Sequence, residues 1–253
     1  MSPISADATA IRRLIGGRAL VAALLATAIA ACTGGSERTA RTTSTTSTTT
    51  TTSTTTTSTT ALPPGPPPYA YAVSNVTAAE LGASWHVGCP VDPANLRRIS
   101  VSIVGFDGVA GTGQVVVNAD VVDDVVESFR RLYAARFPIR KLKPIFTQAE
   151  FEDFETPDDN SSGFSCRNAV DANAAPHWSN HAYGHAIDIN PIENPYLNGG
   201  RVIPSAGAAY TDRSNVRAGM AVGSGVAVAA FRAVGWGWGA SFGDYQHFST
   251  NGH

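Results

Sequence analysis

The stretch SNHAYGHAIDIN, residues 179–190, decides the fold of this chain. His181 and His185 stand four residues apart, a spacing that would place both rings on one face of a helix, as in the zinc-binding HExxH motif. That interpretation fails, because Gly184 interrupts a helix and the motif's glutamate is missing. The run 185–190 alternates apolar and polar residues, which predicts a strand that follows a turn at the glycine.

In such a strand Ile187 and Ile189 face the core, and Asp188 faces the opposite side, toward a cleft. His181 precedes the strand in a turn that can bring its ring over the same cleft. A third donor must come from elsewhere, and His247 in the strand-like run YQHF is the best candidate. Two imidazoles and one carboxylate leave a fourth position open, which is typical of a catalytic zinc site. The alternative is a structural role for each side chain.

Two further side chains could carry chemistry beside such a site. Asp244 stands three residues before His247 and suits a general base that takes a proton from a metal-activated water. Arg167 follows Cys166, and a disulfide at that cysteine could hold the arginine in place. A fixed guanidinium can bind a substrate carboxylate or stabilise an oxyanion.

The N-terminal quarter of the chain predicts export. Basic residues precede the apolar run 19–31, and Cys32 follows small residues in a pattern that resembles a lipobox. We therefore expect residues 1–31 to be a lipoprotein-type signal peptide and Cys32 to be lipidated, with an ordinary signal peptide as the alternative. The Thr/Ser- and Pro-rich segment 32–68 predicts a disordered stalk. The expected location is the outer face of the bacterial cytoplasmic membrane, facing the cell wall, with the lipid anchor as the contact to the membrane.

Residues 69–253 predict one domain. It carries 13 of the 18 basic residues and 18 of the 20 acidic ones, without a basic cluster, so nucleic acid is not an expected partner. Cys89 and Cys166 are the two cysteines left in this domain, and we predict that they form a disulfide. Zinc bound by these cysteines is less consistent with the sequence, because neither belongs to a CxxC pair.

The hydrophobic pattern of the domain predicts an α+β fold, a small antiparallel sheet with flanking helices. The acidic run 150–159 lies in the polar, irregular stretch 147–180 and lacks calcium-loop spacing, so a solvated face is predicted there. Asp120 is the expected N-cap of the first helix. The expected strands and helices are strands 97–106, 114–119 and 139–145, a turn at 106–113, helices 120–137 and 224–235, and a short strand around His247.

Two separated motifs resemble one family. Residues 179–188 resemble the SxHxxGxAxD signature of zinc D-alanyl-D-alanine carboxypeptidases, which include VanY-like peptidases and L-alanyl-D-glutamate endopeptidases of the hedgehog/DD-peptidase fold. Residues 244–247 resemble the later (D/E)xxH element of the same family, and the resemblance covers most of 85–250. It implies one zinc ion held by His181, Asp188 and His247, Asp244 as base, Arg167 as substrate-binding arginine, and Ser179 in a substrate-binding or structural role. His185 falls on a free position of the signature.

The resemblance implies hydrolysis of peptidoglycan stem peptides, at a D-Ala–D-Ala or an L-Ala–D-Glu bond. An aspartate as base is similar to the endopeptidases, whereas the Cys166-Arg167 context is closer to the carboxypeptidases. Phe242 stands where a tryptophan is expected, which affects the shape of one pocket wall. The alternative is a non-catalytic lipoprotein that keeps the zinc fold in order to bind cell-wall peptides.

Overall fold

The structure, a computed structural model, describes residues 66–152, 158–170 and 175–253, which belong to one compact unit, Ala61–His253. The predicted signal peptide, the lipidation site Cys32 and nearly all of the predicted stalk lie outside the described residues. No helix in the described part of the chain is long and apolar enough to cross a membrane.

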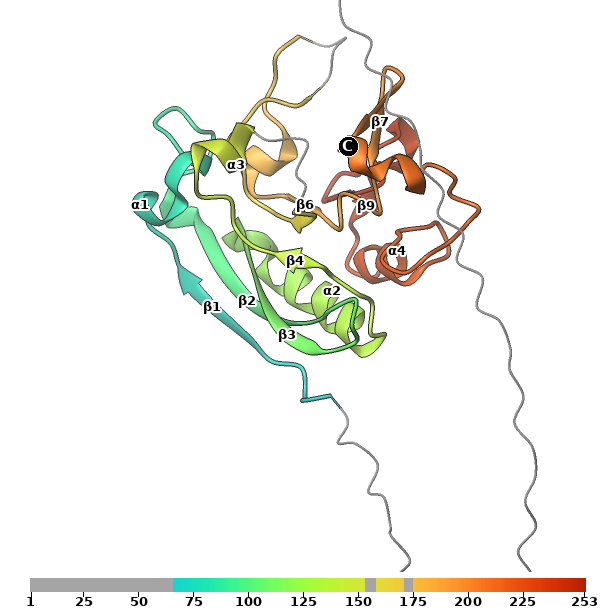
Figure 1. The fold of residues 1–253 in the computed structure, drawn as a ribbon. Coiled ribbons are helices and arrows are strands. Elements are labelled where there is room, and N and C mark those ends of the chain that lie inside the picture. The colour runs from blue at the N-terminus through green and yellow to red at the C-terminus, as the bar shows by residue number, and fades with distance from the viewer. Residues whose placement is uncertain (1–65, 153–157, 171–174) are drawn as a thin grey trace, which may run out of the picture. The chain divides into compact units, whose positions relative to one another are not determined.

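Two three-stranded antiparallel sheets and four helices make up most of the fold, which confirms the α+β prediction (Figure 1). The first sheet has the order β1-β2-β3 and the second has the order β6-β10-β9; β4 and β5 form a parallel pair, and β7 and β8 an antiparallel pair. The strands are β1 Tyr71–Asn75, β2 Leu96–Val104, β3 Ala110–Asn118, β4 Lys141–Leu142, β5 Asn160–Ser161, β6 Ala186–Asp188, β7 Tyr196–Asn198, β8 Arg201–Ile203, β9 Gly237–Trp238 and β10 His247–Ser249. The helices are α1 Ala78–Leu81, α2 Val122–Ala134, α3 Gln148–Glu152 and α4 Val226–Arg232.

One of two apolar clusters among the described residues joins the two sheets. Helix α2 packs against β2 and α4, and its buried residues include Val125 and Phe129 (Figure 1). Phe231 of α4 stacks on Phe248 of β10 with ring centroids 4.3 Å apart. Ile187 of β6 is fully buried in the same cluster. The core therefore fixes the orientation of β6 and β10, the two strands that carry candidate site residues.

The hairpin of β2 and β3 is longer than predicted. The expected turn over 106–113 is wrong, because pairing continues to Val104 and Ala110 and leaves a short turn closed by the bond from Gly105 N to the Val109 carbonyl. Gly113 belongs to the paired strand, since a Cβ there would lie 2.6 Å from Leu142. Gly113 therefore indicates close packing of the strand and not a loop.

The N-cap prediction for the first long helix is also wrong. The N-cap position of α2 is Val121, which makes no side-chain cap hydrogen bond. Asn118 caps the 3₁₀ turn Ala119–Val121 that leads into the helix, and its side-chain oxygen accepts a hydrogen bond from Asp120 N at 3.4 Å. The Asp120 carboxylate instead contacts His185 Nε2 at 3.0 Å. The helix ends at Ala134, before the predicted 137, because Arg136 takes a left-handed conformation with φ of 54°.

One further predicted strand is shortened, and two elements were not predicted. The strand expected over 139–145 is reduced to β4, because Pro138 and Pro144 on either side have no N–H to donate. Helix α3 lies in the stretch expected to be irregular, where Glu150 accepts from Thr147 N and Thr147 Oγ1 in a capping-box arrangement. Strand β1 was not predicted, since all five of its residues are exposed and show no alternation.

Gly184 sits where a side chain cannot fit. Its φ is 71°, and a Cβ would lie 2.5 Å from the backbone nitrogen of Asn118 in β3. Gly199 has a similar φ of 56°, but nothing lies within 4 Å of its Cβ position. We expect Gly199→Ala to lower the free energy of unfolding by roughly 1 kcal/mol, the cost of the left-handed backbone alone. Gly184→Ala should lower it by about 2 kcal/mol more, because the clash is with backbone. Urea unfolding of both variants measures this difference, and equal losses would contradict the packing argument.

Glu193 is a buried carboxylate whose ionisation should destabilise the fold. Its side chain is 1% exposed and lies 3.2 Å from Arg140 Nη2, and Nε of the same arginine lies 3.2 Å from the buried Asp159. Burial first, and the neighbouring Asp159 second, raise the pKa of Glu193 to about 7, although Arg140 opposes this. Tyr210 also faces Glu193, with its hydroxyl 3.4 Å from Oε1.

The free energy of unfolding should therefore fall as the pH rises from about 4.5 to 7, because the folded state holds this proton more tightly than the unfolded chain. Glu193→Gln removes the titration and should flatten the slope. Urea unfolding at a series of pH values measures it. Glu80→Gln is the control: the pKa of the exposed Glu80 is lowered by its hydrogen bonds to Thr77, so the slope above pH 5 should not change. An unaltered slope in Glu193→Gln would contradict the assignment.

Candidate active site

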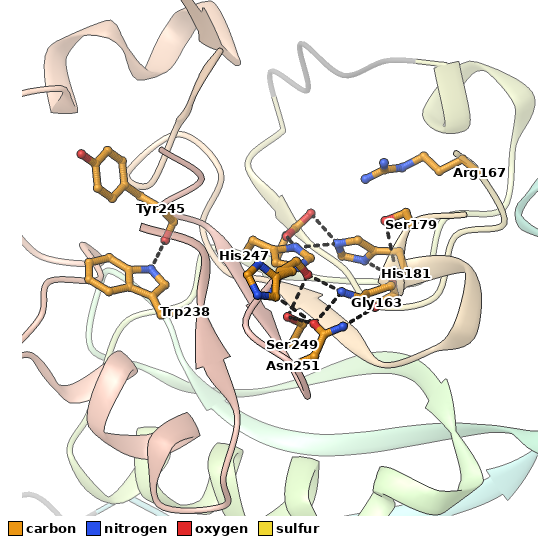
Figure 2. A network of polar contacts seen from close by, with 12 residues as sticks. Gly163, Arg167, Ser179, His181, Trp238, Tyr245, His247, Ser249 and Asn251 are labelled. Carbon is orange, nitrogen blue, oxygen red and sulfur yellow. Dashed lines mark hydrogen bonds and ion pairs between the residues drawn. The ribbon is translucent and has the colours of Figure 1, made fainter. Parts of the chain in front are cut away.

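One cavity of about 1220 Å³ brings together all six predicted site residues of the domain's cleft. They come from segments up to eighty residues apart, and their arrangement around His181 and His247 is shown in part in Figure 2. The residues are Arg167, Ser179, His181, Asp188, Asp244 and His247. His185 points elsewhere, since its ring contacts Asp120.

His181 is held by a capped 3₁₀ turn, Asn180–Tyr183. Ser179 is the N-cap, and its Oγ accepts a hydrogen bond from His181 N at 3.3 Å. Gly184 ends the turn in a left-handed conformation. The His181 side chain is almost completely buried at the cavity wall, and the hydrogen bond that Ser179 Oγ accepts supports the turn that holds it there.

Asp188 and His247 are direct partners across β6 and β10. The antiparallel register pairs His247 with Asp188, and the next pair is Phe248 with Ile187. Side chains alternate along each strand, so the apolar pair enters the core and the polar pair enters the cavity. The register thus sets the carboxylate and the imidazole side by side.

The three donor groups converge on one point. His181 Nε2 lies 3.2 Å from His247 Nδ1 and 3.2 Å from an oxygen of Asp188, and His247 Nδ1 lies 3.2 Å from the other carboxylate oxygen. Tetrahedral ligands at the usual zinc distances are about 3.3 Å apart. The spacing of the three donors therefore fits a four-coordinate metal ion with one open position.

The hydrogen bonds on the far side of each ring support the same conclusion. His181 Nδ1 lies 2.7 Å from the Gly163 carbonyl, and His247 Nε2 lies 3.0 Å from the main-chain oxygen of His253 (Figure 2). A main-chain oxygen only accepts, so each of these nitrogens carries the proton. Their partner nitrogens then turn lone pairs toward each other and toward a carboxylate, an arrangement that requires a positive charge.

Electrostatics at this corner of the cavity agrees with a cation site. Burial lowers the pKa of His181, so its ring is neutral. Burial alone would raise the pKa of Asp188, but His181 and His247 hold it well below its usual range. Burial would also lower the pKa of His247, yet Asp188 raises it. The carboxylate therefore stays ionised beside rings that lie within bonding reach of one ion.

Asp244 lines the cavity with an unsatisfied oxygen. Its Oδ1 is buried and has no hydrogen-bond partner among the described residues. Burial first and the Asp188 carboxylate second raise the pKa of Asp244 to about 7, while His247 and Arg167 oppose this. A carboxylate of this kind can exchange a proton with a bound water near neutral pH.

Arg167 is tied by its backbone to the turn that carries His181. Ser179 N donates to the Arg167 carbonyl at 3.1 Å, and Ser165 N donates to the His181 carbonyl at 3.1 Å. Cys166, which precedes the arginine, forms a disulfide with Cys89 across a Cα–Cα distance of 5.8 Å. The guanidinium lies at the cavity wall, where it can bind an anionic group of a ligand.

The groups that support the candidate ligands leave little signal in the sequence. The supporting oxygens belong to the backbone of Gly163 and His253, and a backbone acceptor leaves no trace in residue type. The amide pair of Asn180 and Asn251 was missed as well, although one adjoins His181 and the other follows His247 by four residues. The cluster of His86, Cys89 and Cys166 also has metal-ligating spacing, but both sulfurs are in the disulfide.

Comparison with known proteins identifies this part of the chain. Residues 172–250 match the family model of D-alanyl-D-alanine carboxypeptidases. Neither the curated proteins nor the solved structures include a match. The matched segment contains Ser179, Asp244 and the three converging donors, and Arg167 lies five residues before it. The resemblance is thus confirmed over this segment: residues 172–250, which carry most of the candidate site residues, are similar to the D-alanyl-D-alanine carboxypeptidase family.

Proposed function

We propose that the protein is a zinc metallopeptidase that hydrolyses stem peptides of peptidoglycan, at a D-Ala–D-Ala or an L-Ala–D-Glu bond. One observation carries this proposal. Three metal-binding atoms with tetrahedral spacing converge in a cavity that also holds an arginine and a carboxylate oxygen of Asp244 with no hydrogen-bond partner in the described part of the chain. A metal site that only stabilised the fold would have no use for the last two groups.

The side chains divide the chemistry of amide hydrolysis among them. A zinc ion held by His181, Asp188 and His247 would polarise a water molecule and lower its pKa. Asp244 would take the proton from that water, hold it on its carboxylate and return it to the leaving amine. Arg167 would hold a carboxylate of the substrate or stabilise the negative charge on the attacked carbonyl.

The cavity suits a peptide rather than a small metabolite. Its volume of about 1220 Å³ exceeds the usual range of roughly 300–1,000 Å³ for small-molecule pockets. Polar and aromatic side chains share its lining, among them Trp178, Tyr196 and Asn198. A segment of several residues could lie there, which is compatible with either of the two bonds.

We place this activity outside the cell. The proposed signal peptide and lipidation at Cys32 would anchor the chain to the outer face of the cytoplasmic membrane. The Thr/Ser-rich segment would then act as a spacer between the membrane and the domain. This location is supported by the residue pattern of 1–68 and by the cell-wall substrates of the matched family.

Removing a ligand tests the metal site. We expect one zinc per chain in the wild-type protein and loss of zinc in His181→Ala and His247→Ala, measured by mass spectrometry of the metal after dialysis. Hydrolysis of a defined stem pentapeptide should fall by about three orders of magnitude or more in both variants, because the metal contributes several kcal/mol to the reaction. His185→Ala is the matched control and should keep both zinc and activity, since its ring contacts Asp120 instead. Loss of zinc in His185→Ala alone would contradict the ligand assignment.

Replacing the candidate base separates an enzyme from a peptide-binding protein. Asp244→Asn keeps the shape of the side chain, so the variant should retain zinc and bind the stem peptide. Its kcat should fall by roughly 10²–10⁴-fold, the usual contribution of a general base. Product analysis by mass spectrometry on D-Ala-D-Ala and L-Ala-D-Glu substrates gives both the rate and the bond. Zinc binding and peptide binding without cleavage in the wild-type protein would favour the non-catalytic alternative.

A further inference from the structure

The ring of His247 offers a metal its Nδ1 atom, and its Nε2 atom points away from the cavity corner. Nε2 lies 3.0 Å from the main-chain oxygen of His253. The same oxygen accepts from Ser249 Oγ at 3.0 Å and from the side-chain amide of Asn180. Three hydrogen bonds, from His247, Ser249 and Asn180, thus hold the His253 oxygen in place behind a candidate metal ligand.

Asn251 organises this arrangement. Its Oδ1 accepts from the Asn180 side chain at 2.9 Å, from His253 N at 3.0 Å and from Ser249 Oγ at 3.3 Å. Its Nδ2 donates back to the Asn180 side chain at 3.3 Å. The network is shown in Figure 2. One side-chain amide therefore fixes both the segment 251–253 and its contact with the turn before His181.

We propose that Asn251, paired with Asn180, is a positioning residue for the metal site: it holds the His253 oxygen that keeps the proton on His247 Nε2 and leaves Nδ1 free to bind metal. This inference rests on the proposed metal site, but not on the peptidase activity. The amide pair also joins the two segments that carry the histidine ligands, since Asn180 adjoins His181 and Asn251 follows β10.

The effect of this network falls on metal affinity more than on stability. Asn251 is exposed, and a hydrogen bond at an exposed site contributes little to folding. An imidazole without a fixed partner can carry its proton on either nitrogen. Only the tautomer of His247 with the proton on Nε2 leaves a lone pair on Nδ1, the atom that lies beside His181 Nε2 and Asp188 Oδ1. Partners behind metal-binding histidines change metal affinity by about 10–100-fold, and an exposed partner belongs at the lower end.

Three variants of the full chain test the proposal, with zinc alone as the probe. Asn251→Leu removes every hydrogen bond of the amide and should weaken zinc binding by about tenfold in competition with a chelator. Asn251→Asp keeps the acceptor oxygen for Asn180, Ser249 and His253 N, so it should restore most of the affinity. Asn95→Leu is the matched control, the same substitution at an exposed residue of the turn before β2, and should bind zinc as the wild type does.

Nitrogen NMR of the histidine rings gives a readout that a merely structural role would not change. In the zinc-loaded wild type, His247 should show a slowly exchanging proton on Nε2, and Asn251→Leu should lose this protection. If Asn251→Leu fails to fold by circular dichroism, Asn180→Leu, which removes the other half of the pair, replaces it. Wild-type affinity in a folded Asn251→Leu variant, or a metal-bound Nε2 in wild-type His247, would overturn the proposal.

These results stay distinct from those for the proposed function. Zinc binding that depends on Asn251, in a protein that cleaves no stem peptide, would support the positioning role and count against the peptidase. Cleavage of the stem peptide by a protein whose zinc affinity does not depend on Asn251 would support the peptidase and contradict the positioning role.

Discussion

The pairing of His247 with Asp188 across β6 and β10 is the constraint on which the rest of the site depends. It is one of only three residue pairs between these strands, and the next pair, Phe248 with Ile187, is fully buried. A slip of one residue in either strand would turn that strand's apolar side chain into the cavity and its polar side chain into the core. The packing of Phe248 against Phe231 of α4 opposes such a slip. Core packing thus sets the geometry of the polar site on the other side of the same two strands.

The site also depends on backbone oxygens that direct the protons of two rings. The Gly163 carbonyl holds a proton on His181 Nδ1, and the His253 oxygen holds one on His247 Nε2. Gly163 can do this because it lies against β3, where a Cβ would be 2.4 Å from the Val116 carbonyl. Both rings then present lone pairs to the same point as a carboxylate. The cation site follows from proton positions that the backbone imposes and not only from the residue types that line the cavity.

The sequence predicts those parts of the fold and of the site that depend on neighbouring residues, and it does not predict those that depend on contacts between distant segments. Alternation in AIDIN separates Asp188 from its apolar neighbours, and Gly184 marks the end of the turn that carries His181. The strand-like run around His247 made this residue the best third donor, but no local pattern says that β10 pairs with β6 across some sixty residues and sets His247 opposite Asp188. The cap before α2 shows another limit. Asn118 and Asp120 are both good cap residues, but only Asn118 acts as a cap, of the 3₁₀ turn before α2, whereas the Asp120 carboxylate contacts His185, which lies far along the chain. Strand β1 gave no pattern because none of its residues is buried.

Arg167 reaches the site although it lies outside the segment that matches the family. Its carbonyl accepts from Ser179 N, and Ser165 beside it donates to the His181 carbonyl, so the arginine segment and the ligand turn are joined by two backbone hydrogen bonds. Cys166 lies between these two residues, with its nitrogen bonded to the Ser84 carbonyl and its sulfur bonded to Cys89. The disulfide and the packing of Cys166 therefore anchor the segment Ser165–Arg167 to the apolar cluster that contains Leu81 and Leu96, the first residue of β2. In this way the sheet of β1, β2 and β3, which supplies none of the three metal-binding atoms, anchors the backbone that carries Arg167 beside the turn of His181.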